Sequence, residues 1–158
     1  MHRVFCATPW ELEAERRAFY DVIGAFNESE AMPRGILYVT VSLAAMRDKR
    51  PYQYTVEENI RDCRHYLLVL SEGWGPPERN FEPDLRLATV CAGDPSLPMQ
   101  SVCVLLRAPE DKPFASELAA AGVTPILFQG LPEFREKIVP LLHGWLQADS
   151  SRAASSTT

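Results

Sequence analysis

Residues 65–71 are His65-Tyr66-Leu67-Leu68-Val69-Leu70-Ser71, an almost continuous run of apolar side chains. The turn-forming sequence Glu72-Gly73-Trp74-Gly75-Pro76-Pro77 follows it directly. A short apolar run closed by such a turn predicts a strand that is buried on both faces of a sheet. Strands of this kind belong mainly to parallel sheets covered by helices, so this stretch indicates an α/β fold.

Four further strands and five helices are predicted outward from this stretch, from short β-branched runs and from apolar residues at helical spacing. The predicted strands are residues 3–7, 35–42, 101–106 and 124–128, and the predicted helices are residues 10–26, 55–63, 81–91, 114–121 and a last one from 131. This alternation predicts a three-layer, flavodoxin-like domain. Its five-stranded parallel sheet would have the order 2-1-3-4-5, with helices on both faces.

The length of 158 residues, with 46% hydrophobic and 23% charged residues, is typical of one globular domain. We expect that domain to span residues 1–147. Residues 148–158 are rich in Ser, Thr and Ala and are predicted to form a disordered tail.

Several classes of function are disfavoured by composition. A formal net charge of -5 and the lack of basic runs argue against nucleic acid as a partner. No apolar stretch is long enough for a membrane span and no signal peptide is recognisable, so we expect a cytoplasmic protein. The cysteines form no CxxC pair, and the histidines have the spacing of neither a zinc site nor a Ser-His-acid triad. No metal and no cofactor are predicted.

The usual phosphate-binding loops are also absent from the sequence. Neither GxxxxGK[ST] nor GxGxxG occurs, and the link Ala7-Thr8-Pro9-Trp10 after the first strand has no glycine. A Walker-type ATP site is thereby excluded, and a dinucleotide bound in the Rossmann manner is disfavoured.

In a sheet of this order, ligands bind beyond the carboxyl ends of the strands, where the first and third strands meet. The polar and aromatic residues that follow these two strands are therefore the candidate site: Thr8, Trp10, Ser71, Trp74, Arg79, Glu82 and Asp84. A carboxylate beside aromatic rings can stabilise an oxocarbenium-like ribosyl centre while the rings stack on a base, which is the chemistry of N-glycosidic cleavage. The competing interpretation is that the acids complement helix dipoles and the tryptophans pack over the core.

Three motifs in order along residues 3–91 resemble those of one superfamily. They are Arg3-Val4-Phe5-Cys6-Ala7-Thr8 followed by residues 12–16, then residues 59–71, and then Trp74-Gly75 followed by residues 81–88. Together they resemble the TIR-like (Toll/interleukin-1-receptor-like) superfamily, especially a bacterial branch of TIR-like domains. The resemblance implies an intracellular signalling or defence domain that cleaves the N-glycosidic bond of NAD or a related nucleotide as its substrate.

The resemblance also implies roles for individual residues. Enzymatic relatives carry an essential glutamate on the helix after the third strand. The resemblance implies Glu82 as the first choice for that role here, and the alternatives are that Asp84 or neither residue is the equivalent. Nucleoside deoxyribosyltransferases share a related fold and use a helix-borne glutamate, so base exchange is an alternative. A third alternative is a non-catalytic module that binds itself or a protein partner through the connection Leu43 to Tyr54. Its candidate contact residues are Arg47, Lys49 and Arg50.

Overall fold

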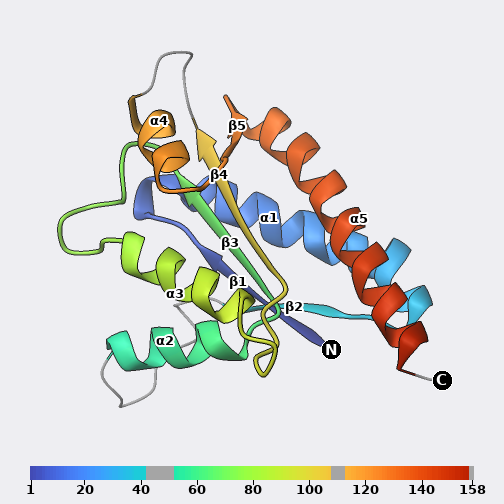
Figure 1. Ribbon diagram of the computed structural model, residues 1–158. Helices are drawn as coiled ribbons and strands as arrows, with labels where there is room; N and C mark the ends of the chain where they lie inside the picture. Colours follow the sequence, from blue (N-terminus) through green and yellow to red (C-terminus); the bar gives the residue numbers. More distant parts are fainter. Residues whose placement is uncertain (42–51, 108–112, 157–158) are drawn as a thin grey trace.

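The computed structural model describes residues 1–41, 52–107 and 113–156. Within these residues, five strands form one parallel sheet (Figure 1). The strands are β1 (His2–Ala7), β2 (Tyr38–Val41), β3 (His65–Leu70), β4 (Ser101–Arg107) and β5 (Ile126–Phe128). Their order is β2-β1-β3-β4-β5, and every neighbouring pair is parallel. The predicted fold class and strand order are confirmed.

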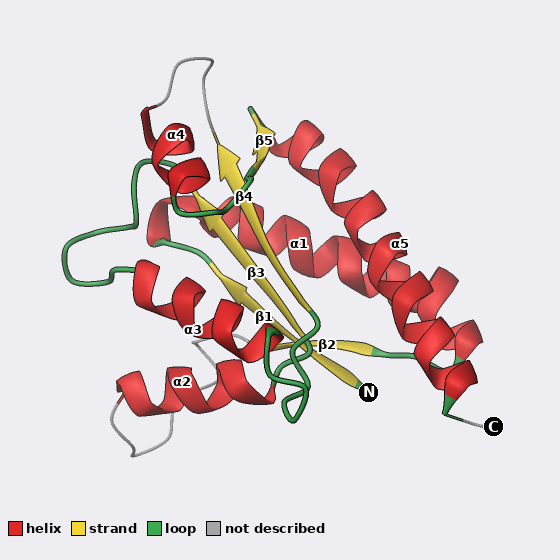
Figure 2. Cartoon of the chain, in the orientation of Figure 1, coloured by secondary structure: helices red, strands yellow, loops and turns green. Residues whose placement is uncertain are grey.

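Helices cover both faces of this sheet and make three layers (Figure 2). Two of them pack on one face, α1 (Glu13–Phe26) and α5 (Leu131–Ser155). The other face is covered by α2 (Tyr52–Asp62), α3 (Glu82–Ala92) and α4 (Pro113–Ala120). Because each crossover carries a helix, all strands end at the same edge of the sheet, which we call the carboxyl edge.

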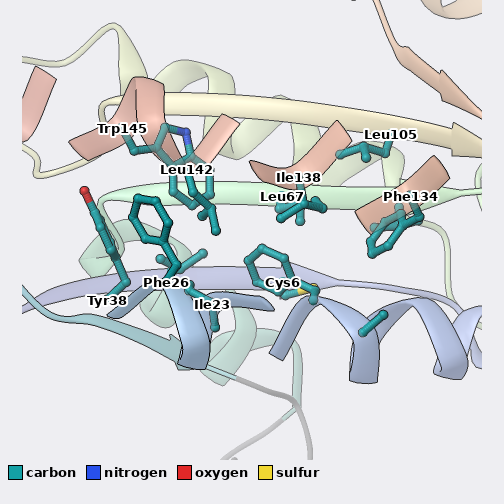
Figure 3. Close-up of a cluster of buried hydrophobic side chains, with 14 of the residues drawn as sticks. Cys6, Ile23, Phe26, Tyr38, Leu67, Leu105, Phe134, Ile138, Leu142 and Trp145 are labelled. Atoms are coloured by element: carbon teal, nitrogen blue, oxygen red, sulfur yellow. The ribbon is translucent and has the colours of Figure 1, made fainter. Parts of the chain in front are cut away.

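Each face of the sheet has its own apolar core. On the α1 and α5 face, Cys6, Leu67 and Leu105 from three adjacent strands meet apolar side chains of both helices (Figure 3). Successive strand residues point to opposite faces, so Tyr66, Leu68 and Leu70 belong to the core under α2, α3 and α4. This alternation also decides on which face the polar residues beyond each strand lie.

The helical region that begins with α1 extends further than the sequence predicted. Residues 27–34 are polar and were expected to be a loop, but a π-helical turn (Asn27–Ala31) and a 3-10 turn (Met32–Arg34) continue α1. The reason is the buried amide of Asn27, which donates to Tyr38 O at 2.8 Å and accepts from Tyr38 N at 2.9 Å. The side chain thus pairs with β2 as a neighbouring strand would.

The predicted disordered tail is wrong for most of its length. α5 continues through residues 148–155, and Asp149 in this segment is buried. The Ser and Ala residues around it are compatible with a helix, while the buried carboxylate holds the segment against the sheet. Although α5 has 25 residues, neither it nor any other helix among the described residues is long and apolar enough to span a membrane.

Candidate active site

The ends of β1 and β3 lie side by side, as the predicted site requires. The two strands pair in parallel, with Ala7 opposite Leu68. Beyond them, the Ser71 hydroxyl donates to Glu11 Oε1 at 3.4 Å. Glu11 belongs to the 3-10 turn Trp10–Leu12 between β1 and α1, and Ser71 directly follows β3. The residues that trail the two strands therefore converge on one place at the carboxyl edge.

The end of β4 adds a basic residue to this place. Leu70 pairs with Leu106, so Ser71, directly after β3, follows the residue that pairs beside Arg107, the last residue of β4. Arg107 Nη1 donates to Glu15 Oε1 of α1 at 3.1 Å. Val69 and Leu105 face α1 and α5, and by alternation Ser71 and Arg107 project to that same face. A cluster of four residues, Glu11, Glu15, Ser71 and Arg107, thus lies at the carboxyl edge on the α1 face.

The two predicted catalytic acids have very different surroundings on α3. Glu82 lies in the first turn, accepts from Arg86 Nη2 at 2.5 Å, and has a side chain that is 40% exposed. Asp84, two residues later, is only 1% exposed and forms an ion pair with Arg79. Solvent therefore reaches the Glu82 carboxylate, whereas the Asp84 carboxylate is buried and paired with Arg79.

The loop between β3 and α3 is fixed by contacts that set the position of Glu82. The amide of Phe81 donates to Trp74 O at 2.9 Å, and Asn80 Oδ1 accepts from Glu82 N at 3.0 Å. The latter contact lies just before the N-cap Phe81 and satisfies the first amide of α3. The Arg79 guanidinium lies 4.3 Å from the centre of the Phe81 ring, so the ion pair with Asp84 also anchors the loop.

The two tryptophans of the predicted site have different surroundings. Trp74 packs edge-on against Phe114 of α4 at 5.2 Å between ring centres, and its Nε1 donates to Glu117 Oε1 at 3.4 Å. Trp10 is 85% exposed, and its role in substrate binding stays a prediction. The short 3-10 turn that begins at Trp10 directs the indole to the surface, while its neighbour Leu12 enters the core. Thr8 is half-buried directly after β1.

Two further predictions concern the residues for protein interaction and a metal site. The interaction residues Arg47, Lys49 and Arg50 lie outside the described residues. The connection that carries them ends earlier than predicted, because α2 begins at Tyr52. In the part of the chain that the structure describes, no three His, Cys, Asp or Glu side chains gather as a metal site would need.

A Ser-His-Asp arrangement, which the spacing of the histidines did not indicate, lies at the opposite edge of the sheet. His65 Nδ1 is 2.6 Å from Ser101 Oγ, and His65 Nε2 is 3.0 Å from Asp149 Oδ2. Because an ionised carboxylate only accepts hydrogen bonds, Nε2 donates to Asp149 and the Ser101 hydroxyl donates to Nδ1. The imidazole is buried and stacked on Trp145 at 4.2 Å. This network joins α5 to the sheet, and its histidine and aspartate are both buried.

The charges of this network shift the pKa values of its members. Burial lowers the pKa of His65, against the hydrogen bond and charge of Asp149, which raise it. Burial alone would raise the pKa of Asp149, but hydrogen bonds from His65, Tyr38 and Arg64 outweigh burial and hold it well below its usual value. In the folded protein, the imidazole of His65 is therefore neutral and the carboxylate of Asp149 beside it is ionised.

Comparison with known proteins adds a structural relative at low sequence identity. No protein-family model matches the chain, and no curated protein sequence matches it. Among solved structures, the chain is similar to the CMP N-glycosidase BcmB of Clostridium botulinum, with a TM-score of 0.53 and 17% identity. The similarity covers 88% of this chain and 98% of that chain. At this identity the match shows a shared fold, and it extends over nearly the whole of both molecules.

Proposed function

We propose that this protein hydrolyses the N-glycosidic bond of a nucleotide at the carboxyl edge of its sheet. The observation that carries the proposal is the hydrogen bond between Ser71 and Glu11, because it brings a carboxylate that follows β1 next to a hydroxyl that follows β3 at the switch point of the sheet. The shared fold with a CMP N-glycosidase supports the same chemistry and makes CMP the first substrate to test.

The reaction needs one accessible carboxylate near the anomeric carbon. As the bond between C1′ and the base nitrogen breaks, its electron pair goes to the base, which takes up a proton. The carboxylate stabilises the positive charge that develops on the ribosyl ring or attacks C1′, and water then adds to C1′. For CMP the products are cytosine and ribose 5-phosphate.

Glu82 and Glu11 are the two carboxylates that could perform this step. Glu82 is exposed at the start of α3, where the loop contacts hold its backbone in place. Glu11 is exposed beside Ser71. Asp84 acts differently, since its buried carboxylate pairs with Arg79 and thereby holds the loop that carries Glu82. We assign Glu82 the catalytic role, with Glu11 as the alternative and Asp84 as a positioning residue.

Release of free base from purified protein tests the proposal directly. We expect cytosine to appear when the protein is incubated with CMP, followed by chromatography, with NAD and the other nucleoside monophosphates assayed in parallel. Glu82→Gln should lower the rate by about a hundredfold or more if this carboxylate acts in the transition state. The matched control is Glu28→Gln, since Glu28 is exposed on the turn that follows α1, far from the carboxyl edge.

The same series separates the candidate residues. A larger loss in Glu11→Gln than in Glu82→Gln would move the catalytic role to Glu11. Asp84→Asn should raise KM and lower stability together, as expected for a residue that acts through Arg79. If the wild-type protein releases no base from any of these nucleotides, the proposed hydrolase activity is wrong.

A second candidate function is association with another copy of the chain or with a protein partner, as in signalling TIR-like domains. The exposed indole of Trp10 favours it, because tryptophan is enriched at protein interfaces. Light scattering would test it on Trp10→Ala and on a variant in which Arg47, Lys49 and Arg50 are replaced. A wild-type mass equal to one chain at high concentration would argue against self-association.

A further inference from the structure

Glu15 is an acidic residue in an apolar position. It lies on α1 between Leu12 and Phe19, three and four residues away, and so shares the buried face of the helix. Its side chain is 4% exposed. One carboxylate oxygen accepts from Arg107, while the other, Oε2, is buried without a hydrogen-bond partner.

Such a residue is a poor choice for stability alone. Replacing a buried ion pair by well-packed apolar side chains is often neutral or stabilising, because desolvation of the charges offsets their attraction. Because Glu15 Oε2 has no hydrogen-bond partner, still more of the free-energy cost of desolvation is left uncompensated. The position of Glu15 is better explained by what it does to Arg107.

Arg107 lies where a ligand at the carboxyl edge would reach it. It ends β4 next to Ser71, which in turn contacts Glu11. Adjacent strands are about 4.8 Å apart, so a carboxylate and a guanidinium flank Ser71 within the span of one nucleotide. The Arg107 side chain is 37% exposed, and Glu15 holds it from the buried side.

We propose that Arg107 binds the phosphate group of the nucleotide substrate and that Glu15 is a positioning residue that orients its guanidinium. A guanidinium matches phosphate oxygens in a bidentate manner and keeps its charge at all relevant pH values. In a nucleoside monophosphate, the base on C1′ and the phosphate arm on C4′ project from the same face of the ribose, so one edge can hold both. This inference rests on the proposed nucleotide substrate and adds a preference for nucleotides over nucleosides.

Binding to the full chain, measured by calorimetry, tests this preference. The probe pairs are CMP against cytidine and ribose 5-phosphate against ribose, and the second pair contains no bond that the enzyme could cleave. We expect the wild-type protein to bind the phosphorylated member of each pair at least tenfold more tightly. Arg107→Gln should weaken binding of the phosphorylated members by about tenfold to a hundredfold and leave cytidine unchanged. Arg135→Gln, on the exposed side of α5, is the matched control and should bind like the wild type.

Variants of Glu15 test the positioning role. Glu15→Leu continues the apolar face of α1, so the free energy of unfolding in urea should not fall, but the preference for CMP over cytidine should. Glu15→Gln keeps an oxygen that accepts from Arg107, so it should restore part of the preference. Equal loss of CMP and cytidine binding in Glu15→Leu would show a merely structural role and contradict the assignment.

The binding measurements and the hydrolase assay can fail independently of each other. If Arg107→Gln keeps the wild-type preference for phosphorylated ligands, the phosphate site is wrong even where the protein releases cytosine. If the preference depends on Arg107 but no base is released, the phosphate site stands and the proposed hydrolysis fails.

Discussion

The phenolic hydroxyl of Tyr38 donates a hydrogen bond of 2.8 Å to Asp149 Oδ2, across 111 residues of sequence. Arg64 Nε lies 2.6 Å from the other oxygen of the same carboxylate, and His65 Nε2 completes the set. One buried acid on α5 therefore holds residues of β2 and β3 and the arginine just before β3. We call these four residues the Asp149 network.

The Asp149 network should make a large contribution to stability. Asp149→Ala leaves the Arg64 charge, the Tyr38 hydroxyl and the His65 ring without their shared acceptor, so we expect a loss of about 3 to 5 kcal/mol in the free energy of unfolding. Urea denaturation followed by circular dichroism measures it. The exposed neighbour Gln147 provides the control, and Gln147→Ala should change stability by less than about 0.5 kcal/mol.

Truncation should show where the folded chain ends. A chain that stops at residue 147 lacks Asp149, and its melting temperature should fall as far as that of Asp149→Ala. A chain that stops at residue 152 keeps the network and should melt close to the full-length protein. Equal melting temperatures for the two truncated chains would mean that residues 148–152 contribute nothing.

Acid should destabilise the protein in two steps. The pKa of His65 is lowered in the folded state, so the unfolded chain binds the proton more readily. The stability that comes from keeping His65 neutral is therefore lost as pH falls below about 6.5. The pKa of Asp149 is lowered too, and its contribution is lost only below about pH 4. Free energies of unfolding measured between pH 8 and pH 3 should show both steps.

Substitution of the histidine identifies the first acid step. In His65→Gln the slope between pH 7 and pH 5 should shrink markedly. His2, whose pKa burial also lowers, is less buried, so His2→Gln should reduce the slope to a smaller extent. An unchanged slope in His65→Gln would mean that this imidazole does not titrate on unfolding as described.

Two glycines of the loop after β3 should respond differently to alanine. Gly75 has φ of +102°, and an added Cβ would lie 2.7 Å from Arg79 O and 2.8 Å from Phe81 Cδ2. Gly73 has φ of +73° but open space around it. Gly73→Ala should cost about 1 kcal/mol from backbone conformation alone. Gly75→Ala should cost more and should also lower the rate of base release, because it displaces the loop that carries Glu82.

Much of the fold was predictable because its signals are local. The apolar run of β3 and the spacing of Phe19, Ile23 and Phe26 in α1, with Leu12 just before it, report burial directly in the sequence. Parallel, right-handed connections limit the strand orders that such elements permit, and the order 2-1-3-4-5 is one of the two common ones. Turn regions were less predictable, since Asn27 finds its partner in Tyr38 only after the chain has folded.

The contacts of the Asp149 network and the pairing of Glu15 with Arg107 were not predictable for the same reason. Asp149 contacts residues that are 84, 85 and 111 positions away, and its neighbours in sequence suggest only a polar tail. Glu15 and Arg107 are 92 residues apart. The one available signal was the position of Glu15 on the apolar face of α1, which a helical projection of the sequence would have shown.

The catalytic assignment of Glu82 and the TIR-like relationship stay predictions that the assays above address. The prediction that the trailing residues of β1 and β3 meet is confirmed by the pairing of the strands. What the sequence could not supply was which way each side chain turns there. Trp10 points to the surface and Asp84 into the domain, although both lie close to the predicted crevice in sequence.

The start of β1 and the end of α5 lie at the same side of the molecule, opposite the carboxyl edge (Figure 1). The Asp149 network fixes the second of these ends in place. A surface or a fluorophore attached through either terminus would accordingly leave the carboxyl edge unobstructed. In the binding experiments proposed above, immobilised protein should then behave like protein in free solution.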